Sequence, residues 1–250
     1  MQAAPPAPQV LRARVWQVPP EQHPLVNRAE LQRIHDRAKL QPQALGTRIR
    51  GTPWRRIFSG SSMWGLMLSH LCLVYPVYIF FTWFFIYLVR VRGVSIARAS
   101  WWTSAPFIAN LVLVPVWGCL ADRAAAWWGK RWGRRAVVWL GAISSAMLLW
   151  SGAHTHDNTA ALVQLAVAAG LNFAASSVLW VTCNDIAPDF SGTVSGVMTT
   201  FGSLGGWLSP VVTAAIATRL GWTYALDFAA LVTVASAAAW LMVDADQALA

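Results

Sequence analysis

Six apolar stretches, each near the length of a bilayer crossing, constrain this chain more than any other feature of its sequence. They lie at residues 63–89, 99–120, 136–152, 160–183, 192–218 and 222–243. About 20 residues of helix cross a hydrocarbon core of ~30 Å. A segment inside lipid must satisfy its own backbone hydrogen bonds, and these stretches lack the two-residue alternation of barrel strands. The sequence therefore predicts an all-α membrane protein, a bundle of six transmembrane helices.

The composition agrees with this class and excludes two others. Hydrophobic residues make up 56% of the 250 residues and charged residues only 12%, whereas an ordinary soluble domain carries about a quarter charged residues. So many apolar residues cannot stay solvated, which excludes disorder over the whole length. The three cysteines stand in apolar runs without metal-ligand spacing, which indicates small buried side chains rather than disulfides or a zinc site.

The net charge of +9 is concentrated near the N-terminus, where residues 1–56 hold ten basic and three acidic residues. A basic protein can bind nucleic acid, but the apolar remainder favours a cytoplasmic flank beside a membrane. We therefore expect a lipid bilayer and no nucleic acid as partner. The expected regions are a basic, Pro-rich cytoplasmic segment at 1–60, the helix bundle at 61–243 and a short cytoplasmic tail at 244–250.

The distribution of Lys and Arg also predicts the orientation of the bundle. The segment before the first apolar stretch holds ten of them, and the connection between the second and third stretches holds five. The connections expected on the opposite side hold three, none and one. Cytoplasmic flanks carry an excess of these residues. The prediction is a multi-pass protein of the inner cell membrane with both termini in the cytoplasm.

A short amphipathic helix is expected within the basic segment, at residues 29–40, where Leu31, Ile34 and Leu40 are apolar. Its Arg-rich face could rest on anionic headgroups. It could equally be a solvated linker helix, and the sequence leaves both interpretations open.

The connection between the second and third stretches carries the most specific motif. It reads G-x-x-x-D-R from Gly118 to Arg123, followed by G-R-R at Gly133, Arg134 and Arg135. Asp122, at the membrane edge, can pair with a basic residue of its own loop or with a neighbouring helix end. Such a cluster can hold one conformation closed and release it as bundles rock. The alternative is a basic anchor that only orients the chain.

This motif resembles the cytoplasmic loop motif of the major facilitator superfamily, and further segments resemble the anion:cation symporter family within it. Those segments occur in the family's order over about residues 20–243, at positions 20–24, 29–31, 78–88, 106–107, 185–188 and 205–210. The chain departs from the family pattern at Phe84 and Phe85, which replace Leu-Pro, and at Thr199 and Ser203, which replace Asn.

The resemblance implies that the chain corresponds to the C-terminal half of such a transporter. The full form has two six-helix bundles with a substrate cavity between them. The implied function is transport of small organic anions, such as sugar acids, aromatic carboxylates or related carboxylates, coupled to protons, by alternating access. The alternative is a truncated or split half that acts only with a partner, either a second copy or a complementary N-terminal half, or as a membrane assembly subunit.

Candidate substrate-lining residues are the uncharged polar side chains inside the stretches. At 100° per residue, Tyr75, Tyr78 and Thr82 fall within about 60° of one another on a helix. Such side chains either line a cavity or bond across helices. The six candidates are Tyr75, Tyr78, Thr82, Asn110, Asn172 and Ser203.

Two further groups of candidates are conformational rather than substrate-binding. The basic connection supplies the candidate latch residues Gly118, Asp122, Arg123, Gly133, Arg134 and Arg135. Two small-xxx-small pairs indicate close helix packing, namely Gly192 with Gly196 and Gly202 with Gly206.

The sequence does not indicate an enzyme. It contains no zinc-protease, nucleophile-elbow or P-loop motif, and no nucleophile is paired with a base. We therefore expect no catalytic residues, no metal and no cofactor. Asp227 is the only acid clearly inside an apolar stretch, and His70 could relay protons or be a hydrogen-bonded structural residue.

Overall fold

The computed structural model describes residues 21, 26–40 and 54–246. The chain divides into two compact units, Met1–Gly51 and Thr52–Ala250. Most of the predicted basic segment, the motif at 20–24 except Glu21, and the end of the predicted tail lie outside the described residues.

The first unit contains the predicted amphipathic helix, α2 (Arg28–Leu40). Asn27 begins it, because the Asn27 side-chain oxygen accepts a hydrogen bond from the Glu30 backbone N–H at 2.8 Å. In the second half of α2, His35 Nε2 lies 3.0 Å from Glu21 Oε1, and this contact lowers the pKa of Glu21. The helix is confirmed; its predicted contact with headgroups remains a prediction.

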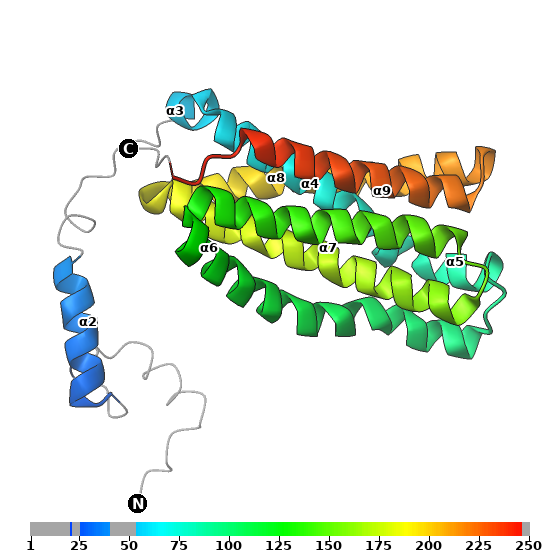
Figure 1. The fold of residues 1–250 in the computed structure, drawn as a ribbon, viewed down its shortest axis with the longest axis horizontal. Coiled ribbons are helices and arrows are strands. Elements are labelled where there is room, and N and C mark those ends of the chain that lie inside the picture. Colours follow the sequence, from blue (N-terminus) through cyan, green and yellow to red (C-terminus); the bar gives the residue numbers. More distant parts are fainter. Residues whose placement is uncertain (1–20, 22–25, 41–53, 247–250) are drawn as a thin grey trace, which may run out of the picture. The chain divides into compact units, whose positions relative to one another are not determined.

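The second unit is a bundle of long apolar helices, and its described residues contain no strand (Figure 1). In chain order its elements are α3 (Trp54–Ser59), α4 (Ser61–Thr82), α5 (Phe84–Arg90), α6 (Ile96–His154), α7 (Asn158–Ile186), η2 (Pro188–Phe190), α8 (Ser191–Arg219), α9 (Trp222–Ala239) and η3 (Trp240–Met242). The first predicted stretch is divided at Trp83, between α4 and α5.

Helix α6 accounts for two of the six predicted crossings. As one straight rod its 59 residues would be about 90 Å long, three times a hydrocarbon core. Instead the chain reverses at Gly129, which has φ 77° and ψ 162°, a conformation that only glycine adopts without strain. The two legs run along the bundle and back (Figure 1). Among the described residues, five helices are long and apolar enough to cross a membrane. Because α6 reverses at Gly129, they provide six crossings, and the predicted fold class is confirmed.

The legs of α6 pack tightly beside their reversal. Gly133 lies against the backbone of Ala124, so closely that a Cβ on Gly133 would overlap the Ala124 carbonyl. Further along, the Trp117 indole N–H donates to the Val137 carbonyl across 3.2 Å. The segment predicted as a connecting loop is thus helical on both sides of a one-residue turn.

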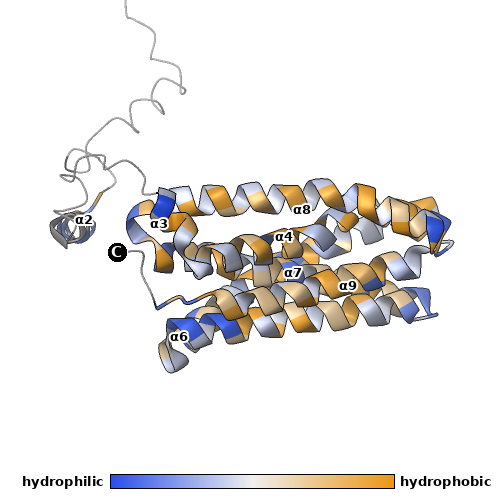
Figure 2. Cartoon of the chain, turned by 90° about the horizontal axis from the view of Figure 1, so that it is seen from above, coloured by the Kyte–Doolittle hydropathy of each residue, from blue (hydrophilic) through white to orange (hydrophobic). Residues whose placement is uncertain are grey.

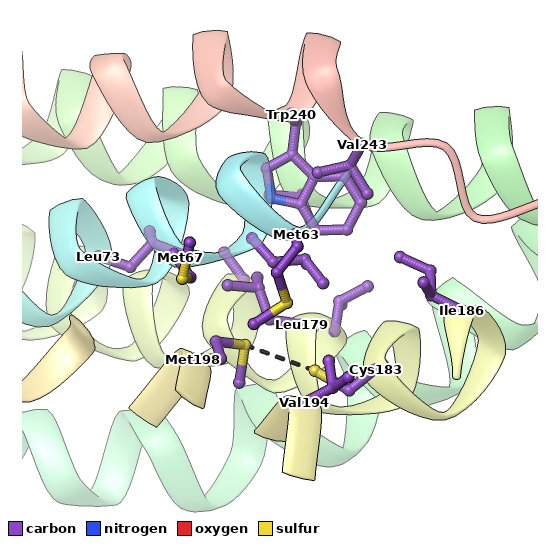
Figure 3. Packing of buried hydrophobic residues seen from close by; sticks show 14 of the residues in the cluster. Met63, Met67, Leu73, Leu179, Cys183, Ile186, Val194, Met198, Trp240 and Val243 are labelled. Carbon is purple, nitrogen blue, oxygen red and sulfur yellow. Dashed lines mark hydrogen bonds between the residues drawn. The ribbon is translucent and has the colours of Figure 1, made fainter. Parts of the chain in front are cut away.

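The apolar interior of the bundle consists of two clusters of buried side chains. Near the reversal, Met63 and Met67 of α4 pack with Met198 of α8, Cys183 of α7 and Trp240 of η3 (Figure 3). The Cys183 thiol lies 3.6 Å from the Met198 sulfur. Two cysteines are buried as predicted, but Cys119 is exposed, because it lies on the outward side of the first α6 leg.

Apolar side chains also cover much of the outside. The first α6 leg exposes Trp101 and Leu111, and α8 exposes Trp207. Figure 2 shows hydrophobic residues along the whole length of the helices and hydrophilic ones mostly gathered at their ends. A surface of this kind is stable in lipid and not in water, so the chain is a multi-pass membrane protein.

Candidate functional site

The bundle has two ends with different chemistry. We call one the Gly129 end; it contains the α6 reversal, the α7–α8 connection and the end of α9. We call the other the Arg92 end; it contains the α5–α6 and α6–α7 connections. The predicted latch residues lie at the Gly129 end.

Arg134 is the centre of an ion-pair cluster at the Gly129 end. Its Nη1 donates to Asp122 Oδ1 at 2.9 Å, and its Nε donates to Asp185 Oδ2 at 3.2 Å. Lys130 Nζ lies 2.9 Å from the other oxygen of Asp185. We call these four residues the Arg134 cluster. The cluster ties both legs of α6 to the C-terminal turn of α7.

Burial makes the Arg134 contact more consequential than a surface ion pair. The Arg134 side chain is 7% exposed and that of Asp185 is 13% exposed, whereas Asp122 is 72% exposed. A pair on the surface contributes little to stability, but removing one partner of a buried pair leaves a charge without compensation. The pairing of Asp122 with an arginine of its own segment follows the motif; the second partner, Asp185, was not predicted.

Arg135, the neighbour of Arg134, binds backbone carbonyls at the C-terminal end of the bundle. Its Nη2 donates to the Val243 carbonyl at 2.9 Å and to the Leu241 carbonyl at 3.2 Å. Its guanidinium carbon also lies 4.9 Å from the centroid of the Trp132 ring. Arg135 therefore fastens the end of η3 and does not join the Arg134 cluster. Close by, Arg131 pairs with Asp244 at 3.2 Å.

The remaining latch candidates are positioned differently. Gly133 permits the close approach of the α6 legs described above, whereas Gly118 has open space where a Cβ would be. Arg123 is exposed and forms no hydrogen bond or ion pair within the described chain.

At the Arg92 end a single arginine joins three segments. Arg92 donates from Nη1 to the Thr155 carbonyl and from Nη2 to the Gly152 carbonyl, both at 2.6 Å, and from Nε to the Tyr87 hydroxyl at 2.8 Å. These carbonyls end α6, where a helix favours a cation. Nothing in the sequence distinguishes Arg92 from Arg90 and Arg98, which occur in the same connection.

Among the predicted lining residues, Tyr75 is fully integrated in the bundle. Its hydroxyl lies 3.1 Å from the Thr213 hydroxyl of α8, and its ring packs edge-on against Phe228 of α9 at 5.7 Å. The Ser209 hydroxyl donates to the Tyr75 carbonyl at 2.7 Å. In this conformation Tyr75 connects helices.

Tyr78, Thr82 and Ser203 are on the accessible side of α4 and α8. All three are exposed. The Thr82 hydroxyl donates to the Tyr78 carbonyl at 2.6 Å, and the Ser203 hydroxyl donates to the Thr199 carbonyl at 2.9 Å. Each of these hydroxyl oxygens can accept a further hydrogen bond.

The two asparagines hold polar atoms that lack partners among the described residues. Asn172 is 1% exposed, and neither its amide nitrogen nor its oxygen is hydrogen-bonded. Asn110 Oδ1 is likewise buried without a partner. Because buried polar atoms in proteins are nearly always bonded, both amides indicate a missing partner, either water, a ligand or a further part of the protein.

Two titratable residues inside the predicted apolar stretches, His70 and Asp227, have polar neighbours on other helices. His70 is buried, its Nδ1 lies 3.5 Å from the Ser176 hydroxyl, and its ring fills the space left by Gly202. Asp227 Oδ1 lies 3.6 Å from His154 Nδ1, which is ion-pair range, and it accepts no hydrogen bond from the described residues. No group of three or more His, Cys, Asp or Glu side chains that could hold a metal occurs in the part of the chain that the structure describes.

The predicted packing glycines separate into two pairs. A Cβ on Gly202 would meet the His70 ring, and one on Gly206 would lie 2.6 Å from Tyr78 Cε2, so both glycines allow α8 to approach α4. A Cβ on Gly192 or Gly196 would meet no described atom within 4 Å. Any packing by this second pair involves atoms outside the described chain.

Comparison with known proteins supports one family. The sequence model of the Major Facilitator Superfamily matches residues 10–206 and 93–249. The chain is 31% identical over 210 residues to the probable sulfoacetate transporter SauU of Cupriavidus necator, with 84% of this chain and 47% of that protein aligned. It is 25% identical over 219 residues to vesicular glutamate transporter 2 of Homo sapiens and of Bos taurus, covering 85% of this chain and 38% of each. The chain thus spans less than half the length of these relatives.

Proposed function

We propose a function on the premise that this chain belongs to the major facilitator superfamily, whose members are membrane transporters rather than enzymes. Two similar proteins are named as transporters of sulfoacetate and of glutamate. Both compounds are small organic acids that are ionised at neutral pH. We infer that this chain takes part in transmembrane transport of small organic anions, including sugar acids or related carboxylates, coupled to protons.

The proposed mechanism is alternating access, in which one bundle rocks against another around a central site. The observation that carries it is the Arg134 cluster, which ties three helix segments together at one end of the bundle only. Breaking it would leave a buried arginine without both of its carboxylates, so the two α6 legs and the end of α7 would keep one arrangement until an alternative pairing becomes available. The other end relies on Arg92 and neutral carbonyls.

The substrate site would lie on the accessible side of α4 and α8. Tyr78, Thr82 and Ser203 present side chains there, and Asn110 and Asn172 supply amide atoms without described partners. No charged side chain is among these five candidates. The charge of the anion would therefore be balanced by groups outside the set, which agrees with a cavity built from two bundles.

The proposed orientation follows the positive-inside rule. The Gly129 end carries Lys130, Arg131, Arg134 and Arg135, and the first unit is strongly basic. We infer that both lie in the cytoplasm, together with the C-terminus, in an inner cell membrane.

A second candidate function is that of a half that does not transport alone. The alignment lengths favour it, since the chain covers 47% and 38% of the two relatives. The exposed side chains of α8 and the first α6 leg would then be covered by a complementary N-terminal half or by a second copy of this chain.

Uptake into proteoliposomes tests both candidates. The chain is reconstituted alone, and also together with the N-terminal half of the sulfoacetate transporter relative, and labelled sulfoacetate, glutamate and gluconate are offered with and without an inward proton gradient. Uptake by the chain alone supports autonomous transport, and uptake only with the added half supports the second candidate. Absence of uptake in every arm contradicts both, and uptake without response to the gradient contradicts proton coupling alone.

A further inference from the structure

The second α6 leg and α9 lie side by side along the bundle (Figure 1), and polar side chains join them at two levels. Toward the α6 reversal, the Trp139 indole N–H donates to the Ala237 carbonyl across 2.8 Å. At the opposite end, His154 Nδ1 lies 3.6 Å from Asp227 Oδ1. The first contact joins neutral groups, whereas the second joins two groups that can each gain or lose a proton.

Asp227 lies in the second turn of α9 and lacks a hydrogen-bond partner for one oxygen. Its Oδ1 is buried and accepts no hydrogen bond from the described residues, although the side chain as a whole is 30% exposed. An ionised carboxylate inside an apolar helix is costly unless a cation faces it. Of the residues that the structure describes, His154 is the one basic side chain within ion-pair range of Asp227.

The hydrogen bonding of His154 shows where its ring would take up a proton. Nδ1 lies 2.9 Å from the Trp150 carbonyl. Because a carbonyl only accepts, Nδ1 carries the hydrogen of the neutral ring, and Nε2 holds the lone pair. Nε2 has no hydrogen-bond partner in the described part of the chain, and the side chain is 44% exposed. Water can therefore deliver a proton to Nε2.

A proton on Nε2 would give His154 a positive charge next to three groups that attract a cation. The first is the Asp227 carboxylate. The second is the C-terminal end of α6, where the helix dipole attracts positive charge. The third is the Trp150 ring, whose centroid lies 5.0 Å from that of His154. Arg92 opposes these attractions, because it binds carbonyls of the same helix end.

The other charged and titratable groups at this end are not within ion-pair range of His154 or Asp227. Asp157 Oδ2 accepts from the Ala160 N–H at the start of α7, and the Tyr87 hydroxyl accepts from Arg92. The rest are exposed and form no hydrogen bond or ion pair within the described chain, namely Arg90, Arg98, His156, Arg219 and Tyr224. The pair is thus the interhelical contact at this end that a proton can change.

We propose that His154 and Asp227 form a proton-binding site that fastens the second α6 leg to α9. Uptake of one proton by Nε2 turns a neutral ring beside a carboxylate into an ion pair, and no other bond forms or breaks. The contact is therefore stronger in weakly acidic solution, where a histidine is protonated and an aspartate is still ionised, and weaker above neutral pH. This goes beyond the proposed function, because the site does not depend on a substrate or on transport.

Proton binding is measured on the purified full chain in nanodiscs by NMR of labelled histidines, titrated between about pH 5 and 8. The signals are assigned with His154→Gln and His156→Gln. Asp227→Asn keeps the shape of the side chain and removes its charge, so it should weaken proton binding by His154 about threefold. Asp227→Glu, which keeps the charge, should weaken it less. The signal of His156 should titrate unchanged in both variants.

Hydrogen exchange measures the fastening itself. Residues 222–230 of α9 should be about twofold better protected near pH 6 than near pH 8. Residues 234–239 serve as the internal reference, because their contact with Trp139 does not titrate. The pH effect should vanish in His154→Gln and Asp227→Asn. It should persist in His156→Gln, the matched control, because His156 is exposed and has no bonded partner in the described chain.

Each outcome decides a part of the proposal. Unchanged proton binding by His154 in Asp227→Asn overturns the site, and a changed affinity without pH-dependent protection overturns the fastening. If Asp227→Asn does not fold, the comparison of wild type with His154→Gln remains, and the same pH dependence in both overturns the proposal. None of these measurements requires transport, so absence of uptake contradicts the proposed function and leaves this inference standing.

Discussion

Gly133 of the second α6 leg lies directly against the Ala124 backbone of the first. This contact sets the distance between the two legs next to their reversal, and it places Arg134 beside Asp122.

We expect Gly133→Ala to destabilise the bundle by about 3 kcal/mol, because the new Cβ would overlap backbone atoms that cannot move aside alone. Gly118→Ala is the control on the same helix; its Cβ meets no described atom within 4 Å, and alanine favours helix by up to about 1 kcal/mol. Thermal unfolding in detergent, followed by tryptophan fluorescence, measures both. Equal melting temperatures for the two variants would show that the legs are not in contact as described.

Arg134→Ala should reduce uptake about tenfold or more while leaving membrane insertion intact. Asp122 and Asp185 would lose their shared partner, so the arrangement that the Arg134 cluster stabilises would be less populated. Arg98→Ala removes the same charge from an exposed site at the Arg92 end and should have little effect. Initial uptake rates, normalised to the amount of inserted protein, decide the question, and an unchanged rate for Arg134→Ala would exclude a latch role.

Arg135→Ala should act on stability rather than on the conformational equilibrium. Its loss frees the Leu241 and Val243 carbonyls and releases the end of η3, so limited proteolysis should remove the C-terminal residues faster than in the wild type. Arg131→Ala, which breaks a more exposed pair with Asp244, should have a smaller effect. Identical digestion of wild type and Arg135→Ala would contradict the fastening role.

At the opposite end, Arg92→Gln should lower stability by about 2 kcal/mol, because a charged group then no longer binds the last carbonyls of α6. Arg90→Gln is the comparison, since Arg90 is exposed and unpaired in the part of the chain described. Hydrogen exchange of the α6–α7 connection should rise in the first variant only. Faster exchange in both would indicate a general charge effect.

The orientation can be tested with single cysteines in a background with all three native cysteines replaced by alanine. His156→Cys lies at the Arg92 end and Trp128→Cys beside Gly129, and both positions are exposed. If the positive-inside interpretation is right, a membrane-impermeant maleimide added to intact cells labels His156→Cys and not Trp128→Cys. The reverse pattern would invert the proposed topology.

The fold followed from the sequence more completely than the site did. Each predicted apolar stretch is helical in the structure. The reason is that the bilayer, and not the neighbouring helices, imposes the length of a crossing. The spacing of Tyr75, Tyr78 and Thr82 predicted one common side of a helix, yet Tyr75 is bonded to Thr213 while Tyr78 and Thr82 are exposed. A helix that is apolar all round carries no signal for its rotation, so only packing against α8 separates these residues.

The sequence by itself predicted six membrane-crossing helices between residues 63 and 243, the concentration of positive charge in the N-terminal segment and one connection, and a pairing of Asp122 with a basic residue of its own connection or with a neighbouring helix end. Only the tertiary structure decided that Arg134 also binds Asp185, 51 residues away, and that Arg135 donates to carbonyls at the end of η3. It also decided that the Phe81 ring lies against Phe107 and Phe173 from two other helix segments. Hydropathy and motif spacing act locally along the chain. The partners of a side chain depend on how rigid helices tilt, rotate and slide against one another, which is settled by the fit of all their surfaces at once.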